Sequence, residues 1–81
     1  ILLIPVGEAF HAFEKKYPEI NLYTDDFRHP SKEGTYLAAS VVFGTLFNLE
    51  VKGTNGKKGI DAKTTLKIQE IADLTVKKFF N

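Results

Sequence analysis

The middle of the chain reads SKEGTYLAASVVFGTLF over residues 31–47. Ser31 is a favourable N-cap, and Glu33 puts a negative charge in the first turn, where it suits the helix dipole. No residue from position 34 to position 47 is charged, and apolar side chains recur nearly all round a helix. The segment therefore predicts a helix from Ser31 to about Phe47 that is buried on more than one side.

Two further helices are predicted on either side of this one. Residues 6–17 carry apolar side chains at helical spacing, and Pro18 ends that pattern at or before Tyr17. The last helix begins after Asp61, a candidate N-cap, and a glycine-rich loop over residues 48–59 precedes it. Most phenylalanines fall on apolar helix stripes and are expected in the core: Phe10, Phe13, Phe43, Phe47, Phe79 and Phe80.

The first four residues, Ile1–Ile4, form a continuous apolar run that Pro5 closes. Such a run is typical of a strand buried on both faces of a parallel sheet, and Ile20–Tyr23 suggests a second short extended piece. A buried parallel strand needs neighbours that this sequence does not supply. We therefore expect an α/β fold, with the chain as the trailing, mostly helical part of a larger α/β domain. The absence of Met agrees with the middle of a longer protein.

Composition narrows the function classes. The chain has 81 residues, enough for one small domain, with 11 basic and 10 acidic residues and a net charge of +1. That balance does not favour nucleic acid as a partner. With no Cys, disulfides and thiolate metal sites are excluded, and no apolar run approaches the ~20 residues that span a bilayer.

One segment carries candidate chemistry. Asp26 and His29 are three residues apart in a polar loop, and Pro30 restricts the backbone of His29. A carboxylate that accepts the Nδ1 proton of His29 would leave Nε2 free to act as a base toward a hydroxyl. The bare Asp-x-x-His pattern also fits a surface Asp beside a turn histidine, so both interpretations stand at this level.

The wider block resembles the last conserved block of the SGNH (GDSL-like) hydrolases. It reads Asp26-x-x-His29-Pro30-Ser31-x-x-Gly34-Thr35-Tyr36-Leu37-Ala38-Ala39, and Pro5-Val6-Gly7-Glu8-Ala9 and Asn21-Leu22-Tyr23 add to the likeness. The resemblance covers roughly residues 1–47 and implies a three-layer α/β/α sandwich with a parallel, flavodoxin-like sheet. It also implies that Asp26 and His29 complete a Ser-His-Asp triad for ester hydrolysis.

On this resemblance, residues 1–81 are the C-terminal portion of a single hydrolase domain. The implied substrate is a small-molecule or carbohydrate ester, without cofactor or metal, and the missing N-terminal part of the domain is the implied partner. The compartment stays open, with a lean toward a bacterial secreted or periplasmic protein. Phe27 and Arg28, between the two triad residues, line a substrate entrance or simply fill the loop.

The sequence departs from the family in one respect that matters for activity. It has no Gly-Asp-Ser-type nucleophile block, and its two serines are explained as a helix cap (Ser31) and a small residue inside a buried helix (Ser40). The fragment alone is therefore expected to be inactive. A non-enzymatic helical interaction module and a degenerate hydrolase fragment remain alternatives. Glu8-x-x-His11 is interpreted as a solvated helix face, and the glycine-lysine stretch over residues 53–59 as a flexible basic turn.

Overall fold

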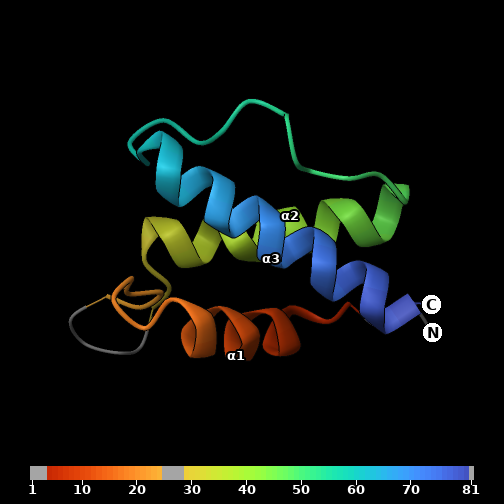
Figure 1. Ribbon diagram of the computed structural model, residues 1–81, viewed down its shortest axis with the longest axis horizontal. Coiled ribbons are helices and arrows are strands. Elements are labelled where there is room, and N and C mark those ends of the chain that lie inside the picture. Colours follow the sequence, from red (N-terminus) through yellow and green to blue (C-terminus); the bar gives the residue numbers. More distant parts are fainter. Residues whose placement is uncertain (1–3, 25–28, 81) are drawn as a thin grey trace.

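The computed structural model describes residues 4–24 and 29–80. Three helices account for most of them: α1 (Val6–Lys16), α2 (Lys32–Phe47) and α3 (Ala62–Phe80). Helices α2 and α3 share the largest contact, and α1 packs against both. The first turn of α1 and the last turn of α3 lie at the same end of the molecule (Figure 1).

Local signals set the helix ends. The carbonyl of Pro5 accepts the first helical bond of α1, from the Ala9 N–H at 3.1 Å. Helix α2 begins after Ser31, whose hydroxyl accepts the Gly34 N–H, and it ends at Asn48, which takes the left-handed conformation at φ 53°. Asp61 accepts the Thr64 N–H at 3.1 Å, as an N-cap does. The three predicted helices and the caps at Ser31 and Asp61 are confirmed.

Each helix contributes one apolar stripe to a single core. The fully buried side chains come from all three helices and from Leu22 in the segment between α1 and α2. Burying a side chain of the size of Phe13 or Leu37 stabilises the fold by about 1.5–3 kcal/mol. The core members are Ala9, Phe13, Leu22, Leu37, Val41, Ile68, Ile71 and Ala72.

The prediction of an α/β fold with a parallel sheet is wrong. Within residues 4–24 and 29–80 no strand forms, and the only extended pairing is an isolated antiparallel bridge between Tyr23 and Pro30. Ile4, the one described residue of the predicted first strand, is 36% exposed. The rest of that strand lies outside the described residues. A strand needs partners, and the described residues offer it only helices.

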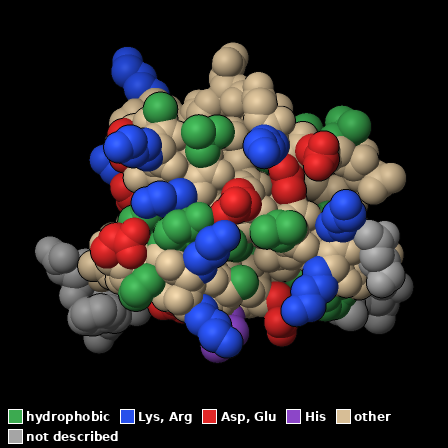
Figure 2. All heavy atoms as spheres, in the orientation of Figure 1, with side chains coloured by type: hydrophobic (Ala, Val, Ile, Leu, Met, Phe, Trp, Pro, Cys, Tyr) green, Lys and Arg blue, Asp and Glu red, His purple; other side chains and the backbone are tan. Residues whose placement is uncertain are grey.

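The prediction that α2 is buried on more than one side is also wrong. Its outward face exposes Phe43 at 38%, Leu46 at 53% and Phe47 at 61%, because α1 and α3 both pack on the opposite side. Phe79 and Phe80 at the end of α3 are exposed as well, which corrects their expected place in the core. On the face seen in Figure 2, apolar side chains lie between lysines and carboxylates rather than beneath them.

Candidate functional site

The candidate site is the turn that joins Leu22 to the start of α2. The Thr24 N–H donates to the His29 carbonyl at 2.8 Å, and the Thr24 hydroxyl donates to the same oxygen at 3.1 Å. One step further in, the Ser31 N–H donates to the Leu22 carbonyl at 2.8 Å. Together with the Tyr23–Pro30 bridge, these bonds form a backbone neck, defined as residues 22–24 paired with residues 29–31. The neck fixes where the backbone of His29 lies.

Ser31 ties this neck to α2. Its hydroxyl donates to the Asn21 carbonyl at 2.8 Å and accepts the Gly34 N–H at 3.1 Å. Gly34 is buried against the same backbone, since a Cβ on it would lie 2.1 Å from the Leu22 carbonyl oxygen. Only glycine lets the first turn of α2 approach the neck this closely.

The structure places one of the two predicted catalytic residues. His29 lies at the mouth of the neck, shortly before the first residue of α2, and its side chain is exposed. Asp26 lies outside the described residues, as do Phe27 and Arg28. The contact between Asp26 and His29 therefore stays a prediction.

Neither serine is a candidate nucleophile in this arrangement. The hydroxyl of Ser31 is engaged on both sides as the helix cap. Ser40 is 3% exposed inside α2, nine residues and so about 13 Å along the helix axis from Ser31. The predictions that Ser31 caps the helix and that Ser40 is a buried helical residue are confirmed.

Comparison with protein-family models, with curated proteins and with solved structures gives no match to this chain. The site is therefore argued from its own geometry.

Other candidate groups are solvated. Glu8 and His11 are both exposed on α1, and His11 lies across a shallow groove from Lys78 and Phe79 of α3. In the part of the chain that the structure describes, no three His, Cys, Asp or Glu side chains come together as metal ligands do. Nor does any helix there have the length and apolar character needed to cross a membrane.

A polar contact between α1 and α3 was not predicted from the sequence. The Tyr17 hydroxyl donates to Glu70 at 2.8 Å, and the Lys16 ammonium donates to the same oxygen at 3.1 Å. The hydrogen bond from Tyr17, followed by that from Lys16, holds the pKa of Glu70 below its ordinary value. The bonds to Glu70 raise the pKa of Lys16 and of Tyr17. Lys67 also lies over the Tyr17 ring, 5.0 Å from its centroid. The bonds from Lys16 and Tyr17 to Glu70 hold α1 and α3 together, so the Glu70 carboxylate is not free to act as an acid or base.

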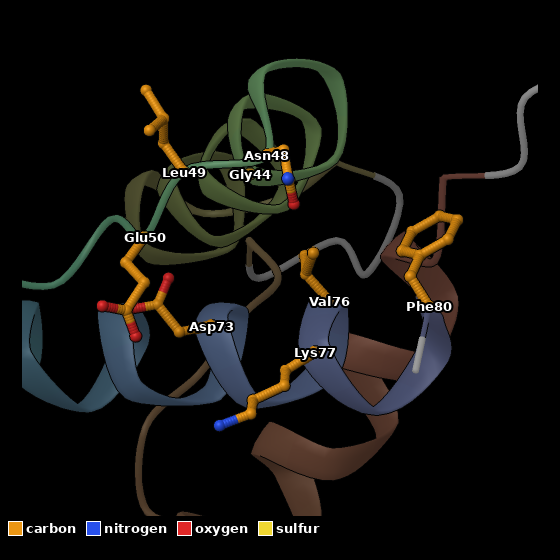
Figure 3. A pocket seen from close by; sticks show the side chains of 8 residues that line it. All are labelled: Gly44, Asn48, Leu49, Glu50, Asp73, Val76, Lys77 and Phe80. Carbon is orange, nitrogen blue, oxygen red and sulfur yellow. The ribbon is translucent and has the colours of Figure 1, made fainter.

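A hollow of about 470 Å³ lies between the end of α2 and α3 (Figure 3). At one end of it are the carboxyl groups of Glu50 and Asp73, and at the other is the ring of Phe80. Asp73 is fully engaged in structure, since its two oxygens accept the N–H groups of Val51 at 2.7 Å and Lys52 at 3.0 Å. The carboxylate thus anchors the segment after α2 and is not available as a catalytic acid or base.

Proposed function

We propose that the segment around His29 supplies the base half of a serine ester hydrolase. The observation that carries the proposal is the neck: the His29 carbonyl is held by Thr24, and α2 begins shortly afterwards, at Lys32. A general base must stay at a fixed distance from its hydroxyl, and a doubly anchored backbone favours that. The resemblance of residues 26–39 to the SGNH hydrolase block points to the same chemistry.

In this proposal His29 takes the proton of a serine hydroxyl at Nε2 while the oxygen attacks the ester carbonyl. The same nitrogen then protonates the leaving alkoxide, and water completes the cycle through the acyl-enzyme. Asp26 accepts the Nδ1 proton, which selects the tautomer and stabilises the imidazolium. The nucleophile and the oxyanion donors come from polypeptide outside these 81 residues, because the Ser31 hydroxyl is the helix cap and Ser40 is buried within α2, away from the neck. The substrate is a small-molecule or carbohydrate ester.

The test is ester hydrolysis by the native protein that contains this sequence, with 4-nitrophenyl acetate as substrate. His29→Ala should lower kcat by roughly 10⁴ or more while the thermal unfolding midpoint stays unchanged, as expected for an exposed catalytic base. His11→Ala is the matched control, because His11 is also exposed and lies on α1, and its kcat should equal that of the wild type. Equal loss in both variants, or none in either, would contradict the assignment, and so would turnover by the 81-residue chain on its own.

A helical interaction module is the second candidate, and one observation favours it. The outward face of α2 exposes Phe43, Leu46 and Phe47 without a charged residue on the helix after position 33. Exposed apolar patches of this kind commonly mark protein contacts. If the native protein has no esterase activity and a Phe47→Ser variant loses self-association in sedimentation velocity, the module becomes the better account.

A further inference from the structure

A second hollow lies beside α2, away from the neck. It shares only Val51 with the Asp73 contact. Its volume is about 340 Å³, and Tyr36, Ala39, Ser40 and Phe43 of α2 line it together with Val51 and Thr54 of the following segment. Of the described residues around it, none carries a formal charge. Small-molecule sites have this size and this mainly apolar lining, with a few polar groups that fix orientation.

The wall of this hollow is held in place by a buried amide. Gln69 is 1% exposed, and its Nε2 donates to the Tyr36 hydroxyl at 2.9 Å and to the Thr54 carbonyl at 3.2 Å. The Thr54 hydroxyl in turn donates to the Val51 carbonyl at 2.6 Å. The helix side and the loop side of the hollow are thus joined through one side chain. A wall fixed in advance lowers the entropy that a ligand must lose on binding.

Ser40 gives the second, independent observation. It is 3% exposed, and within the described structure its hydroxyl has no hydrogen-bond partner. Buried hydroxyls are nearly always paired, so an unpaired one beside an apolar hollow indicates a missing partner. The oxygen itself has less than 1 Å² exposed, so a ligand reaches it only after the Ser40 side chain turns to another staggered χ1 position.

We propose that this hollow binds a small neutral molecule with an apolar body and one hydroxyl or ester oxygen, which pairs with Ser40. A charged ligand would lose its hydration without finding a counter-charge on the lining. The hollow is open toward solvent, and its volume of about 340 Å³ exceeds the roughly 150 Å³ that holds benzene in an enclosed cavity, so a six-carbon alcohol fits. The inference does not depend on the esterase proposal, because no residue of the neck lines the hollow.

The test is a titration of the ¹⁵N-labelled protein with 1-hexanol, followed by amide chemical shifts. Saturable shifts should be confined to residues 36–43 and 51–55, with intermolecular NOEs from the alkyl chain to Phe43 and Val51. Hexanoate, which has the same chain and a negative charge, should bind at least roughly tenfold more weakly. Shifts that do not saturate, or NOEs to other parts of the surface, would overturn the proposal.

Two variants test the lining residues. Ala39→Phe should fill the hollow and abolish the shifts, whereas Ala62→Phe, at another exposed helical alanine, should leave them unchanged. Ser40→Ala should weaken 1-hexanol binding about fivefold, the value of one neutral hydrogen bond. Unaltered affinity in Ser40→Ala would remove the proposed partner and refute the assignment. If the same amides shift with protein concentration alone, a second copy covers the hollow and the ligand proposal fails.

Discussion

Gly34→Ala tests whether the neck and α2 are one rigid unit. A Cβ at position 34 would lie 2.1 Å from the Leu22 carbonyl oxygen and 3.2 Å from the Pro30 Cβ. The shortest usual carbon–oxygen contacts are about 3.3 Å, so the helix and the neck must separate by roughly 1 Å. Overpacking of this kind destabilises the fold by up to about 3 kcal/mol, and the higher helix propensity of alanine offsets about 1 kcal/mol of that loss. The expected net loss is about 2 kcal/mol, a fall in Tm of roughly 10 °C for a chain of this size.

The measurement is urea unfolding of Gly34→Ala, with ¹⁵N amide spectra of the folded protein. Gly7→Ala is the control, because Gly7 is an exposed helical glycine with nothing within 4 Å of its added Cβ, and it should gain up to about 1 kcal/mol. The amides of Thr24 and Ser31 should move in Gly34→Ala, since their N–H groups donate across the neck. If Gly34→Ala is as stable as Gly7→Ala and those amides stay in place, the close approach of α2 to the neck is refuted.

Three further predictions concern polar contacts. Ser31→Ala removes the cap of α2 and should lower the free energy of unfolding by about 1 kcal/mol. Ser40→Ala removes a hydroxyl without a hydrogen-bond partner and should change it very little, so equal values for the two variants in urea unfolding would contradict both assignments. Gln69→Leu should lose about 2 kcal/mol in the same assay, because it removes the two partly buried hydrogen bonds from the amide to Tyr36 and Thr54. An unchanged midpoint would show that the amide is dispensable. Because the fold lowers the pKa of Glu70, this carboxylate stabilises the folded state above pH 4.5, and the stabilisation is lost as the pH falls through the folded pKa. Because the fold raises the pKa of Tyr17, its hydroxyl stabilises the folded state below pH 10.0, and that stabilisation is lost as the pH rises through the folded pKa. Tyr17→Phe should therefore flatten the urea midpoint plotted against pH on both sides, and a profile identical to wild type would refute the contact.

Features that depend on neighbouring residues were predictable from the sequence. The cap at Ser31 and the end of α2 at Phe47 follow from side chains within one turn of each boundary, as does the cap at Asp61. The loop position of His29 was also predictable from its neighbours, because Pro30 restricts the backbone of the residue before it in any fold. The helical frame of the candidate site therefore follows from local sequence alone.

Features that depend on distant partners were not predictable. The run Ile1–Ile4 indicates burial but not the element that provides it. A strand was inferred, whereas the only regular elements within residues 4–24 and 29–80 are helices. The apolar outer face of α2 was expected to be covered, yet both other helices pack on one side of it. The bond between Tyr17 and Glu70 joins residues 53 positions apart, which no spacing rule reaches.

The neck and the acid partner supply different things to the proposed chemistry. Every hydrogen bond named in the neck uses backbone atoms or the hydroxyls of Thr24 and Ser31, and none uses a carboxylate. The backbone of His29 is therefore held by contacts that also begin α2. In the proposed function, Asp26 orients the imidazole ring, selects its tautomer and stabilises the imidazolium. The neck bonds hold backbone atoms of His29, whereas the proposed Asp26 contact acts on its ring, so separate substitutions can test the two contributions.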